Sequence, residues 1–331
     1  MKTYSVAVVG ATGLVGRTIT RVLELRKFPV GSLRLLASQR SAGKKLTFGG
    51  CEHEVQALAA DSFRGVEIAL FSAGAAVSRE FAPHAVRAGT VVIDNSSAFR
   101  MEPEVPLVVP EVNRAMIFRH KGIIANPNCS TIQMVVALKP LHDRWKITRV
   151  VVSTYQSVTG AGQRGLTQLE DEVARRQGGE RKFPHRIAFN IVPQVDVFFE
   201  DGSTREEHKM VDETKKILGD PNVRVSATCV RVPVYGGHSE SVNVEFEKPF
   251  DLNEVRDALR ATPGIIVRDD PSSSSYPMPI DAWERDEVFL GRLRRDTSVP
   301  NGLNMWVVAD NLRKGAATNA VQIAEEWIKG S

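Results

Sequence analysis

The most constraining feature of the sequence is a glycine pattern near its N-terminus, between an apolar run and a segment of helical periodicity. Ser5 to Val9 is apolar, Gly10, Gly13 and Gly16 follow it, and apolar residues recur at helical spacing over 19–23. This order predicts a strand, a glycine turn and a helix. It is a GxxGxxG variant of the dinucleotide fingerprint, whose glycines let the backbone approach a pyrophosphate at a helix N-terminus.

The second predicted strand, Leu33 to Ala37, ends without the acidic residue that usually binds the ribose 2′-hydroxyl of NAD. Ser38, Arg40, Ser41 and Lys44 follow it instead. Hydroxyl groups and cations suit a 2′-phosphate, so this loop favours NADP over NAD. A basic loop that only contacts solvent is the alternative.

Two further apolar runs end in small or polar residues. Val66 to Phe71 leads into Ser72-Ala73-Gly74, and Thr90 to Asp94 leads into a polar segment that reaches Arg100. Ligands of open α/β sheets bind beyond the carboxyl ends of the strands, where these residues are expected. The guanidinium of Arg100 suits a carboxylate or a phosphate, and an ordinary surface ion pair is an equally good interpretation.

Composition limits the classes of function. A chain of 331 residues with 42% hydrophobic and 25% charged residues predicts a globular protein of about two domains. The net charge of +4 is scattered, which argues against nucleic acid, and no apolar run approaches the roughly 20 residues of a membrane span. The three cysteines are widely spaced, so we expect neither disulfides nor a metal site, and a cytoplasmic location.

Cys129 is the candidate nucleophile. The apolar residues that follow it have helical spacing, and Pro127 biases Asn126 towards an extended conformation. Cys129 is therefore expected at a helix N-terminus, where free N–H groups and the helix dipole favour a thiolate. The alternative is a small buried hydrophobic residue, which is the usual state of an isolated cysteine.

The remaining elements follow the same patterns. Strands are predicted at Arg149–Tyr155, Arg224–Val234, Val242–Phe246 and Leu303–Ala309, and helices at 164–177, within Gly202–Leu218, at Leu252–Leu259 and at Leu312–Ile328. His238 follows the Gly236-Gly237 turn, which could present its ring at the edge of a site. The loop over 271–279 is rich in Ser and Pro and could be a crossing segment or a lid.

With these pieces assembled, the chain resembles bacterial aspartate-β-semialdehyde dehydrogenase over essentially its full length. The resemblance is carried by GATGLVG, LLASQRSAGK, DNSSAFRM, PLVVPEVN, NPNCSTIQMVVALKPLH, TYQSVTGAG, REEHKM, SATCVRVPVYGGHSE and WVVADNLRKGAATNAVQIAE. It implies a Rossmann-like NADP-binding domain (1–128 with 311–331) and an α+β catalytic and dimerisation domain with a mixed sheet (129–310). It also implies a homodimer or a dimer of dimers.

The activity implied by the resemblance is the reversible, NADPH-dependent reduction of L-aspartyl-4-phosphate to L-aspartate-4-semialdehyde and phosphate, on the route to lysine, methionine and threonine. The implied catalytic residues are Cys129, His238 and Gln156. The implied substrate ligands are Arg231, Glu207, Lys209, Arg100 and Asn128. The implied cofactor ligands are Gly10, Thr12, Gly13, Leu14, Val15, Gly16, Ser38, Arg40, Ser41, Ser72, Ser157, Gly160 and Asn311.

In this chemistry Cys129 attacks the acyl phosphate, and His238 acts as acid and base and assists ionisation of the thiol. Two rival interpretations remain open. One is another acyl-phosphate reductase, such as an N-acetyl-γ-glutamyl-phosphate reductase or a glyceraldehyde-phosphate dehydrogenase. The other is a non-catalytic NADP-binding paralogue.

Overall fold

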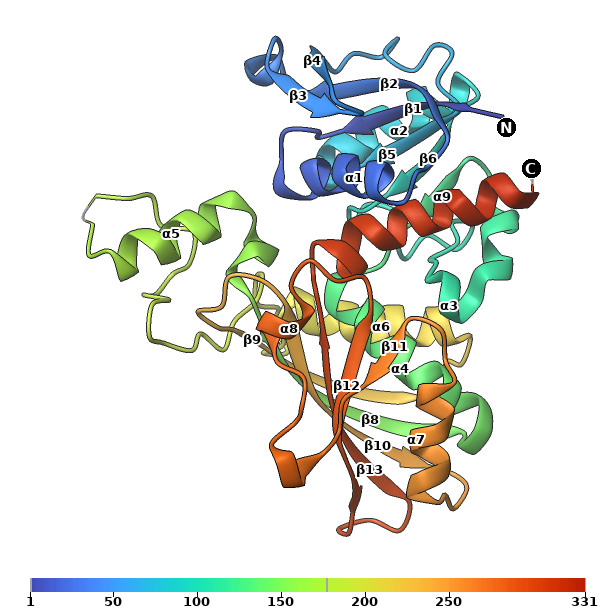
Figure 1. Cartoon of the computed structure of the whole chain (residues 1–331), viewed down its shortest axis with the longest axis vertical. Coiled ribbons are helices and arrows are strands. Elements are labelled where there is room, and N and C mark those ends of the chain that lie inside the picture. Colours follow the sequence, from blue (N-terminus) through green and yellow to red (C-terminus); the bar gives the residue numbers. More distant parts are fainter. Residues whose placement is uncertain (1, 177, 331) are drawn as a thin grey trace. The chain divides into compact units, whose positions relative to one another are not determined.

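The computed structural model describes residues 2–176 and 178–330. The chain divides into two compact units, one of Met1–Pro127 with Ala316–Ser331 and one of Asn128–Gly315. Figure 1 shows both units, coloured along the sequence. Among the described residues, no helix is both long and apolar enough to cross a membrane.

The first unit is built on a seven-stranded sheet in the order β3-β4-β2-β1-β5-β6-β7, parallel except for the β3–β4 pair. Its strands are β1 (Tyr4–Val9), β2 (Val30–Ala37), β3 (Lys45–Phe48), β4 (Cys51–Ala57), β5 (Ile68–Phe71), β6 (Val91–Asp94) and β7 (Ile123–Ala125). Its helices are α1 (Leu14–Leu25), α2 (Ala75–Arg87), α3 (Pro110–Asn113) and α9 (Thr318–Gly330), with 3₁₀ turns at Gln39–Ser41 and Arg114–Arg119.

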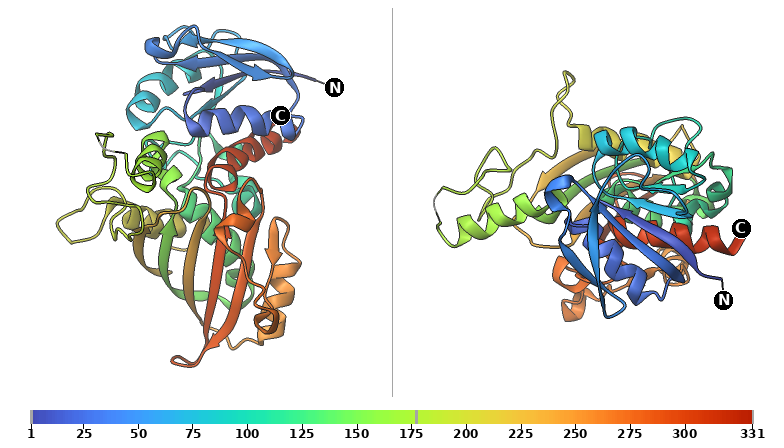
Figure 2. Two further views of the ribbon diagram at one scale, coloured as in Figure 1. Left: turned by 60° about the vertical axis from the view of Figure 1, so that its left-hand side comes forward. Right: turned by 90° about the horizontal axis from the view of Figure 1, so that it is seen from above.

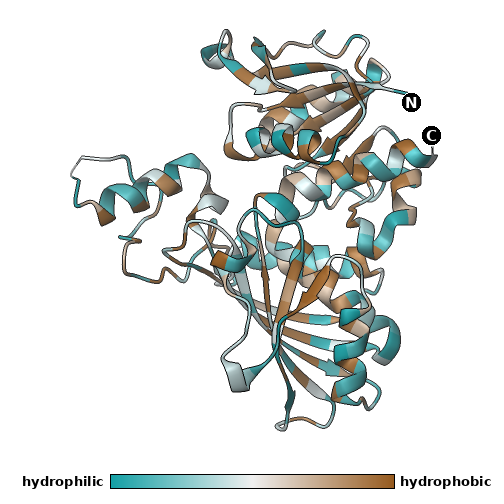
Figure 3. Ribbon diagram, in the orientation of Figure 1, coloured by the Kyte–Doolittle hydropathy of each residue, from teal (hydrophilic) through white to brown (hydrophobic). Residues whose placement is uncertain are grey.

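Strand β1 shows why this sheet is covered on both faces. Val6 and Val8 pack into a core with residues of α1 and α9, whereas Ala7 and Val9 pack into a second core with residues of α2. Successive side chains of a strand point to opposite faces, so a continuous apolar run requires helices on both sides. The central strands are accordingly brown in Figure 3.

The second unit has a six-stranded mixed sheet in the order β11-β12-β13-β10-β8-β9. The strands are β8 (Ile147–Gln156), β9 (Arg224–Arg231), β10 (His238–Phe246), β11 (Ile265–Val267), β12 (Val288–Asp296) and β13 (Gly302–Ala309). The helices are α4 (Cys129–Trp145), α5 (Gln163–Val173), α6 (Arg205–Leu218), α7 (Leu252–Arg260) and α8 (Pro279–Ala282), with 3₁₀ turns at Val158–Ala161 and Pro271–Ser273. The α/β class and the mixed second sheet expected from the sequence are thus confirmed.

Helices α4, α6 and α7 form one layer on this sheet, because α4 contacts both other helices and the four strands β8, β10, β12 and β13. Figure 2 gives two further views of the chain, and its left view shows the strands of this sheet side by side. The inward residues of β8, among them Val150, Val152 and Thr154, alternate with half-buried ones, as expected for a sheet with one covered face. The side chains that the helices cover therefore include the polar residues at the ends of β8, β9 and β10.

Three of the differences between the structure and the sequence-based boundaries have a clear cause or consequence. Strand β9 ends at Arg231 and not at Val234, because its partner β8 ends at Gln156, which is opposite Arg231, and Pro233 has no N–H for a ladder. Helix α5 ends at Val173, short of the predicted 177, which lies outside the described residues. A π-helical turn occupies Arg313–Ala317 before α9, where a continuous helix was expected from Leu312.

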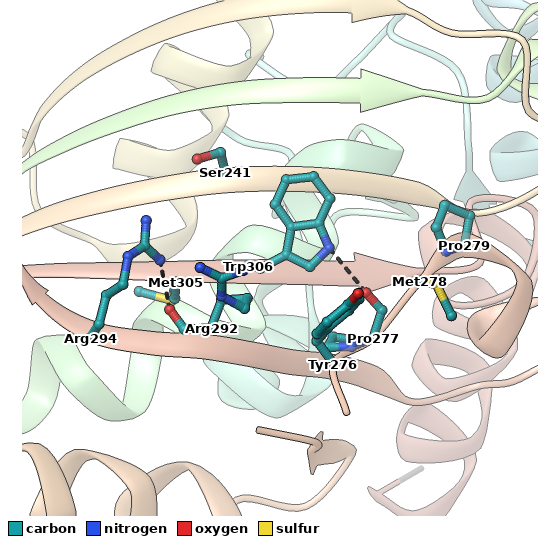
Figure 4. Close-up of a pocket in the computed structure, with 9 residues that line it drawn as sticks. All are labelled: Ser241, Tyr276, Pro277, Met278, Pro279, Arg292, Arg294, Met305 and Trp306. Carbon is teal, nitrogen blue, oxygen red and sulfur yellow. Dashed lines mark hydrogen bonds between the residues drawn. The ribbon is translucent and has the colours of Figure 1, made fainter. Parts of the chain in front are cut away.

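The loop over 271–279 packs on the other face of the same sheet. Trp306 of β13 donates its indole N–H to the carbonyl oxygen of Pro277 at 3.1 Å. Figure 4 shows the pocket beside it, of about 440 Å³, with lining residues Ser241, Tyr276, Pro277, Met278, Pro279, Arg292, Arg294, Met305 and Trp306. None of these is a predicted site residue, so the loop is a crossing segment over its own sheet in this structure.

Candidate active site

The glycine turn of the first unit fits a pyrophosphate. Gly10 has φ +84°, and a Cβ there would lie 2.9 Å from the backbone of Ser72. A Cβ on Gly16 would collide with the carbonyl oxygen of Gly10, so this residue permits close helix–strand packing. Gly13 caps α1 without a side chain, which leaves the first N–H groups of the helix, at Leu14 and Val15, for an anion.

The predicted 2′-phosphate loop lies directly after β2. Ser38 begins a 3₁₀ turn in which the N–H of Ser41 donates to the Ser38 carbonyl oxygen. The hydroxyl of Thr12, from the glycine turn, lies 3.4 Å from that of Ser41, so the two predicted cofactor segments are adjacent. Arg40 is exposed. The structure therefore brings hydroxyls and one cation together beside the glycine turn.

Arg100 lies on the loop after β6 and is largely buried, with its Nη2 donating to the Asn95 carbonyl oxygen at 2.8 Å. The same loop is ordered by Asp94, whose carboxylate accepts hydrogen bonds from Ser78 and from both the N–H and the hydroxyl of Ser96. The Arg100 side chain is therefore buried and fixed by its hydrogen bond to Asn95, unlike an exposed surface cation.

Cys129 is the first residue of α4, as the sequence predicted. Asn128 is the N-cap, and its Oδ1 accepts hydrogen bonds from the N–H groups of Ser130 and Thr131 at 3.0 and 3.2 Å. The N–H of Asn128 donates to Glu213 Oε2 at 2.7 Å. These bonds fix the corner on which the thiol is carried.

Glu206, and not Glu207, faces the polar cluster at this corner. Both oxygens of Glu207 accept backbone N–H groups, from Cys229 at 2.9 Å and from Thr204, with which it forms the capping box of α6. Glu207, the substrate ligand implied by the resemblance, therefore has both carboxylate oxygens bound to the backbone in this structure. Adjacent residues of a helix point about 100° apart, so only Glu206 is directed towards Asn128 and Lys209.

Glu206 is the hub of the cluster. Its Oε1 accepts hydrogen bonds from Asn128 Nδ2 at 2.8 Å and Gln156 Nε2 at 3.0 Å, and its Oε2 accepts one from Lys209 Nζ at 3.0 Å. Burial alone would raise the pKa of this carboxyl, but the Lys209 charge and the three hydrogen bonds outweigh it and lower the pKa to about 2. Thr154 donates to the other end of the Gln156 amide. Glu206 is thus a stable carboxylate.

Arg231, at the end of β9, supplies a second cation, which is buried, whereas Lys209 is half-buried. Its Nη1 donates to the Ser157 carbonyl oxygen at 2.6 Å, and its guanidinium lies 5.8 Å from the centre of the Phe183 ring. Burial lowers its pKa, whereas the nearby Glu206 and Cys129 raise it. The same coupling makes Arg231 favour the thiolate form of Cys129.

Gly160 allows the Arg231 and His238 side chains to lie against the backbone. A Cβ on Gly160 would lie 2.8 Å from Arg231 Nη1 and 3.2 Å from His238 Nε2. Any side chain at this position would therefore occupy the space in front of the guanidinium and the imidazole. A similar close approach, not predicted from the sequence, occurs at Gly315, where a Cβ would lie 2.9 Å from that of Cys129.

His238 is fully buried at the start of β10. Its Nδ1 accepts a hydrogen bond from the Ser157 N–H at 3.1 Å, and a backbone N–H can only donate. The neutral ring therefore carries its proton on Nε2. Burial and the charge of Arg231 lower the His238 pKa to about 3, so the ring is neutral and can donate through Nε2.

Ser157 and Asn311 were predicted to bind the cofactor. In this structure their side chains form hydrogen bonds with each other and with residues around them. Asn311 Oδ1 accepts hydrogen bonds from Ser157 Oγ at 2.9 Å, from Thr159 Oγ1 and from the Gly237 N–H. Its Nδ2 donates to Thr159. Asn311 therefore joins the turn after β8 to the turn before His238.

The second unit thus gathers a thiol at a helix N-terminus, an imidazole N–H, a glutamate, two cations and a primary amide. This combination can hold an anionic, amine-bearing substrate while a cysteine attacks it. Such a constellation is typical of acyl transfer through a thioester.

Two family profiles match the chain. The one described as "Semialdehyde dehydrogenase, NAD binding domain" matches residues 5–120, and the one described as "Semialdehyde dehydrogenase, dimerisation domain" matches residues 138–314. They fall on the first and the second unit respectively.

Relatives match over almost the whole chain. The aspartate-semialdehyde dehydrogenase of Aquifex aeolicus is 60% identical, with 98% of each chain covered. The crystal structure of aspartate semialdehyde dehydrogenase II from Vibrio cholerae complexed with ASA has a TM-score of 0.95 at 49% identity and 99% coverage of both chains. The crystal structure of the Candida albicans enzyme with NADP has a TM-score of 0.77 at 27% identity and 98% coverage of both chains.

Proposed function

Since this chain belongs to the aspartate-semialdehyde dehydrogenase family, we propose that it reduces L-aspartyl-4-phosphate to L-aspartate-4-semialdehyde with NADPH, through a thioester on Cys129. The observation that carries the mechanism is the position of Cys129, at the capped N-terminus of α4 and electrostatically coupled to the buried Arg231. The helix N-terminus and the guanidinium both favour a thiolate, which is the attacking species. The proposed route serves lysine, methionine and threonine synthesis.

The substrate ligands follow from the charges of the cluster. Arg231 suits the α-carboxylate, because a guanidinium binds a carboxylate through two parallel hydrogen bonds. Glu206 replaces Glu207 as the ligand of the ammonium group, since it remains a carboxylate although it is buried. Lys209 is the phosphate ligand in the same unit. Arg100, in the first unit, is retained as a second phosphate ligand.

His238 supports the reaction as a proton donor. Its Nε2–H can stabilise the oxyanion that develops when the thiolate attacks, as can the N–H groups at the start of α4. In this state Nε2 already carries a proton, so ionisation of the thiol falls to Arg231 and the helix terminus. Gln156 is held between Thr154 and Glu206, which makes its amide a fixed positioning group for the acyl oxygen.

The cofactor residues belong to the glycine turn and to the loop after β2. The first N–H groups of α1 would hold the pyrophosphate, and Ser38, Arg40 and Ser41 would hold a 2′-phosphate. When bound, the reduced nicotinamide supplies the hydride that converts the thioester into the aldehyde. The absence of an acidic residue at the end of β2 supports NADP over NAD. The dimerisation-domain match supports a homodimer.

The proposal is tested in the oxidative direction with aspartate semialdehyde, phosphate and either NADP⁺ or NAD⁺. We expect phosphate-dependent reduction of NADP⁺, slower reduction of NAD⁺, and no turnover by Cys129→Ala. Cys229→Ala is the matched control, since this second cysteine is buried on β9. Full activity of Cys129→Ala would refute the thioester, and equal rates with the two nucleotides would refute the proposed preference.

A further inference from the structure

Glu240 lies beneath the active site, two residues after His238 on β10. In the register of the sheet it is opposite Thr154 of β8, and Thr154 is opposite Cys229 of β9. Paired residues of neighbouring strands point to the same face, so these three side chains form one polar row. Residues two apart on a strand also share a face, so the row lies beside that of His238 and under the same helix layer.

The Glu240 carboxyl is fully buried, and neither of its oxygens has a hydrogen-bond partner in the described chain. No cation among the described residues forms an ion pair with it, and its partner on β13 is Val307. A buried carboxylate without a partner is among the most costly arrangements in a protein. The group avoids this cost by keeping its proton, and burial accordingly raises the Glu240 pKa well above its ordinary value.

The side chain of Gln133 on α4 interacts with the Glu240 carboxyl. This interaction offsets part of the rise that burial causes in the Glu240 pKa. The Nε2 of Gln133 donates to the backbone carbonyl oxygen of His238 at 3.3 Å, and its Oε1 has no partner in the described chain. Gln133 is also one helical turn after Cys129. Gln133 therefore already links the helix of the nucleophile to the strand of the imidazole, and a donor for its Oε1 would stabilise this link.

We propose that Glu240 is a positioning residue that functions as a neutral carboxylic acid, donating its hydroxyl to Gln133 Oε1 and so holding the Gln133 amide on the His238 carbonyl. This inference rests on the proposed role of His238. The protonated acid has one donor and Gln133 has one unfilled acceptor, so the pair satisfies both. Ionised Glu240 has no hydrogen to donate and faces the same acceptor oxygen.

The titratable side chain that interacts with Glu240 across the sheet is the Cys229 thiol of β9, one strand beyond β8. Burial is the main cause that raises the pKa of this thiol, and a negative charge on Glu240 would raise it further. The residues facing Glu240 on β8, β13 and α4 are Thr154, Val307 and Gln133, none of which titrates. Loss of the proton from Glu240 is therefore expected to be a separate event that weakens the link between α4 and β10 at alkaline pH.

The test compares wild type with Glu240→Gln and Glu240→Leu. The first replaces the acid by a neutral donor of the same shape, and the second removes the donor. Infrared spectra near neutral pH should show a protonated-carboxyl band in wild type that both variants lack. Urea unfolding supplies the second measurement. Above the ordinary carboxyl pKa the unfolded chain loses the Glu240 proton, whereas the folded chain keeps it. Over this pH range the folding equilibrium constant of wild type should therefore fall about tenfold per pH unit relative to that of Glu240→Gln. These two measurements need no activity.

In turnover of semialdehyde with phosphate and NADP⁺, Glu240→Leu should lose about tenfold in kcat with little change in KM, because the substrate ligands are untouched. Glu240→Gln should restore kcat and lack the alkaline decline that Glu240 adds to the wild-type profile. A wild-type kcat in Glu240→Leu, or an unchanged alkaline limb in Glu240→Gln, would overturn the positioning role. A missing infrared difference would overturn the neutral acid even if the protein proved to have another activity.

Discussion

Replacing Glu206 by Gln should cost the protein about 3 kcal/mol at neutral pH. The pKa of this carboxyl falls from an ordinary 4.5 to about 2, a difference of about 2.5 units, and each unit corresponds to about 1.36 kcal/mol. The group is almost fully buried, so solvent screening reduces this figure little. The glutamine is a neutral mimic of the protonated acid, and its amide would place donors against those of Asn128, Gln156 and Lys209.

The pH dependence gives the sharper test. The folded carboxyl binds its proton more weakly than the unfolded one, so its stabilisation is complete above about pH 4.5 and is lost as the pH falls towards 2. Urea unfolding of wild type and Glu206→Gln should therefore differ by about 3 kcal/mol at pH 7, and by less than half of that near pH 3. Glu207→Gln is the matched control and should lose about 1 kcal/mol of capping free energy while keeping kcat. A difference that is equal at both pH values would refute the assignment.

Three further predictions concern single positions. Gly160→Ala should raise KM for the semialdehyde about tenfold or more with little loss of stability, because the added methyl group would displace the buried Arg231 and His238 side chains. Steady-state kinetics would measure the change in KM, and a thermal melt would measure stability. Arg40→Ala should weaken NADPH binding by about 1 to 2 kcal/mol and leave NADH binding unchanged, as measured by fluorescence titration. Cys229 should resist iodoacetamide in the folded protein, since burial raises its pKa and hides the thiol, and peptide mass mapping after labelling would detect modification that contradicts this.

Local signals were sufficient to predict the strand, glycine turn and helix that begin the first unit, and the position of Cys129. A strand, a glycine turn and a helix are encoded within about twenty consecutive residues, and the N-cap of α4 is the residue next to the cysteine. The β3–β4 hairpin and strand β12 were not predicted. β3 and the first part of β4 are largely exposed, so these segments lack the apolar runs on which the strand predictions relied.

The side-chain roles depend on contacts that the sequence does not encode locally. Glu206 and Glu207 are neighbours in the first turn of α6, and either could have faced the site. The choice is made by the capping box, which commits Glu207 to Thr204 and leaves Glu206 to turn towards Asn128. His238 was expected at the edge of a site because of its glycine turn. The turn is anchored by Asn311, a residue 73 positions further along the chain, and this contact has no local sequence signal.

Three buried or capped glutamates show why burial alone does not determine the state of a carboxyl. Glu206 meets three side-chain donors, one of them a cation, and its pKa falls to about 2 despite complete desolvation. Glu207 meets two backbone N–H groups and caps a helix. Glu240 is as deeply buried as Glu206, but Gln133 is the one side chain that offsets its burial and no cation does so, and its pKa rises. The number and charge of the donors therefore decide between carboxylate and acid, and the enzyme needs both forms if Glu206 is to bind an ammonium group while Glu240 donates a hydrogen bond to Gln133.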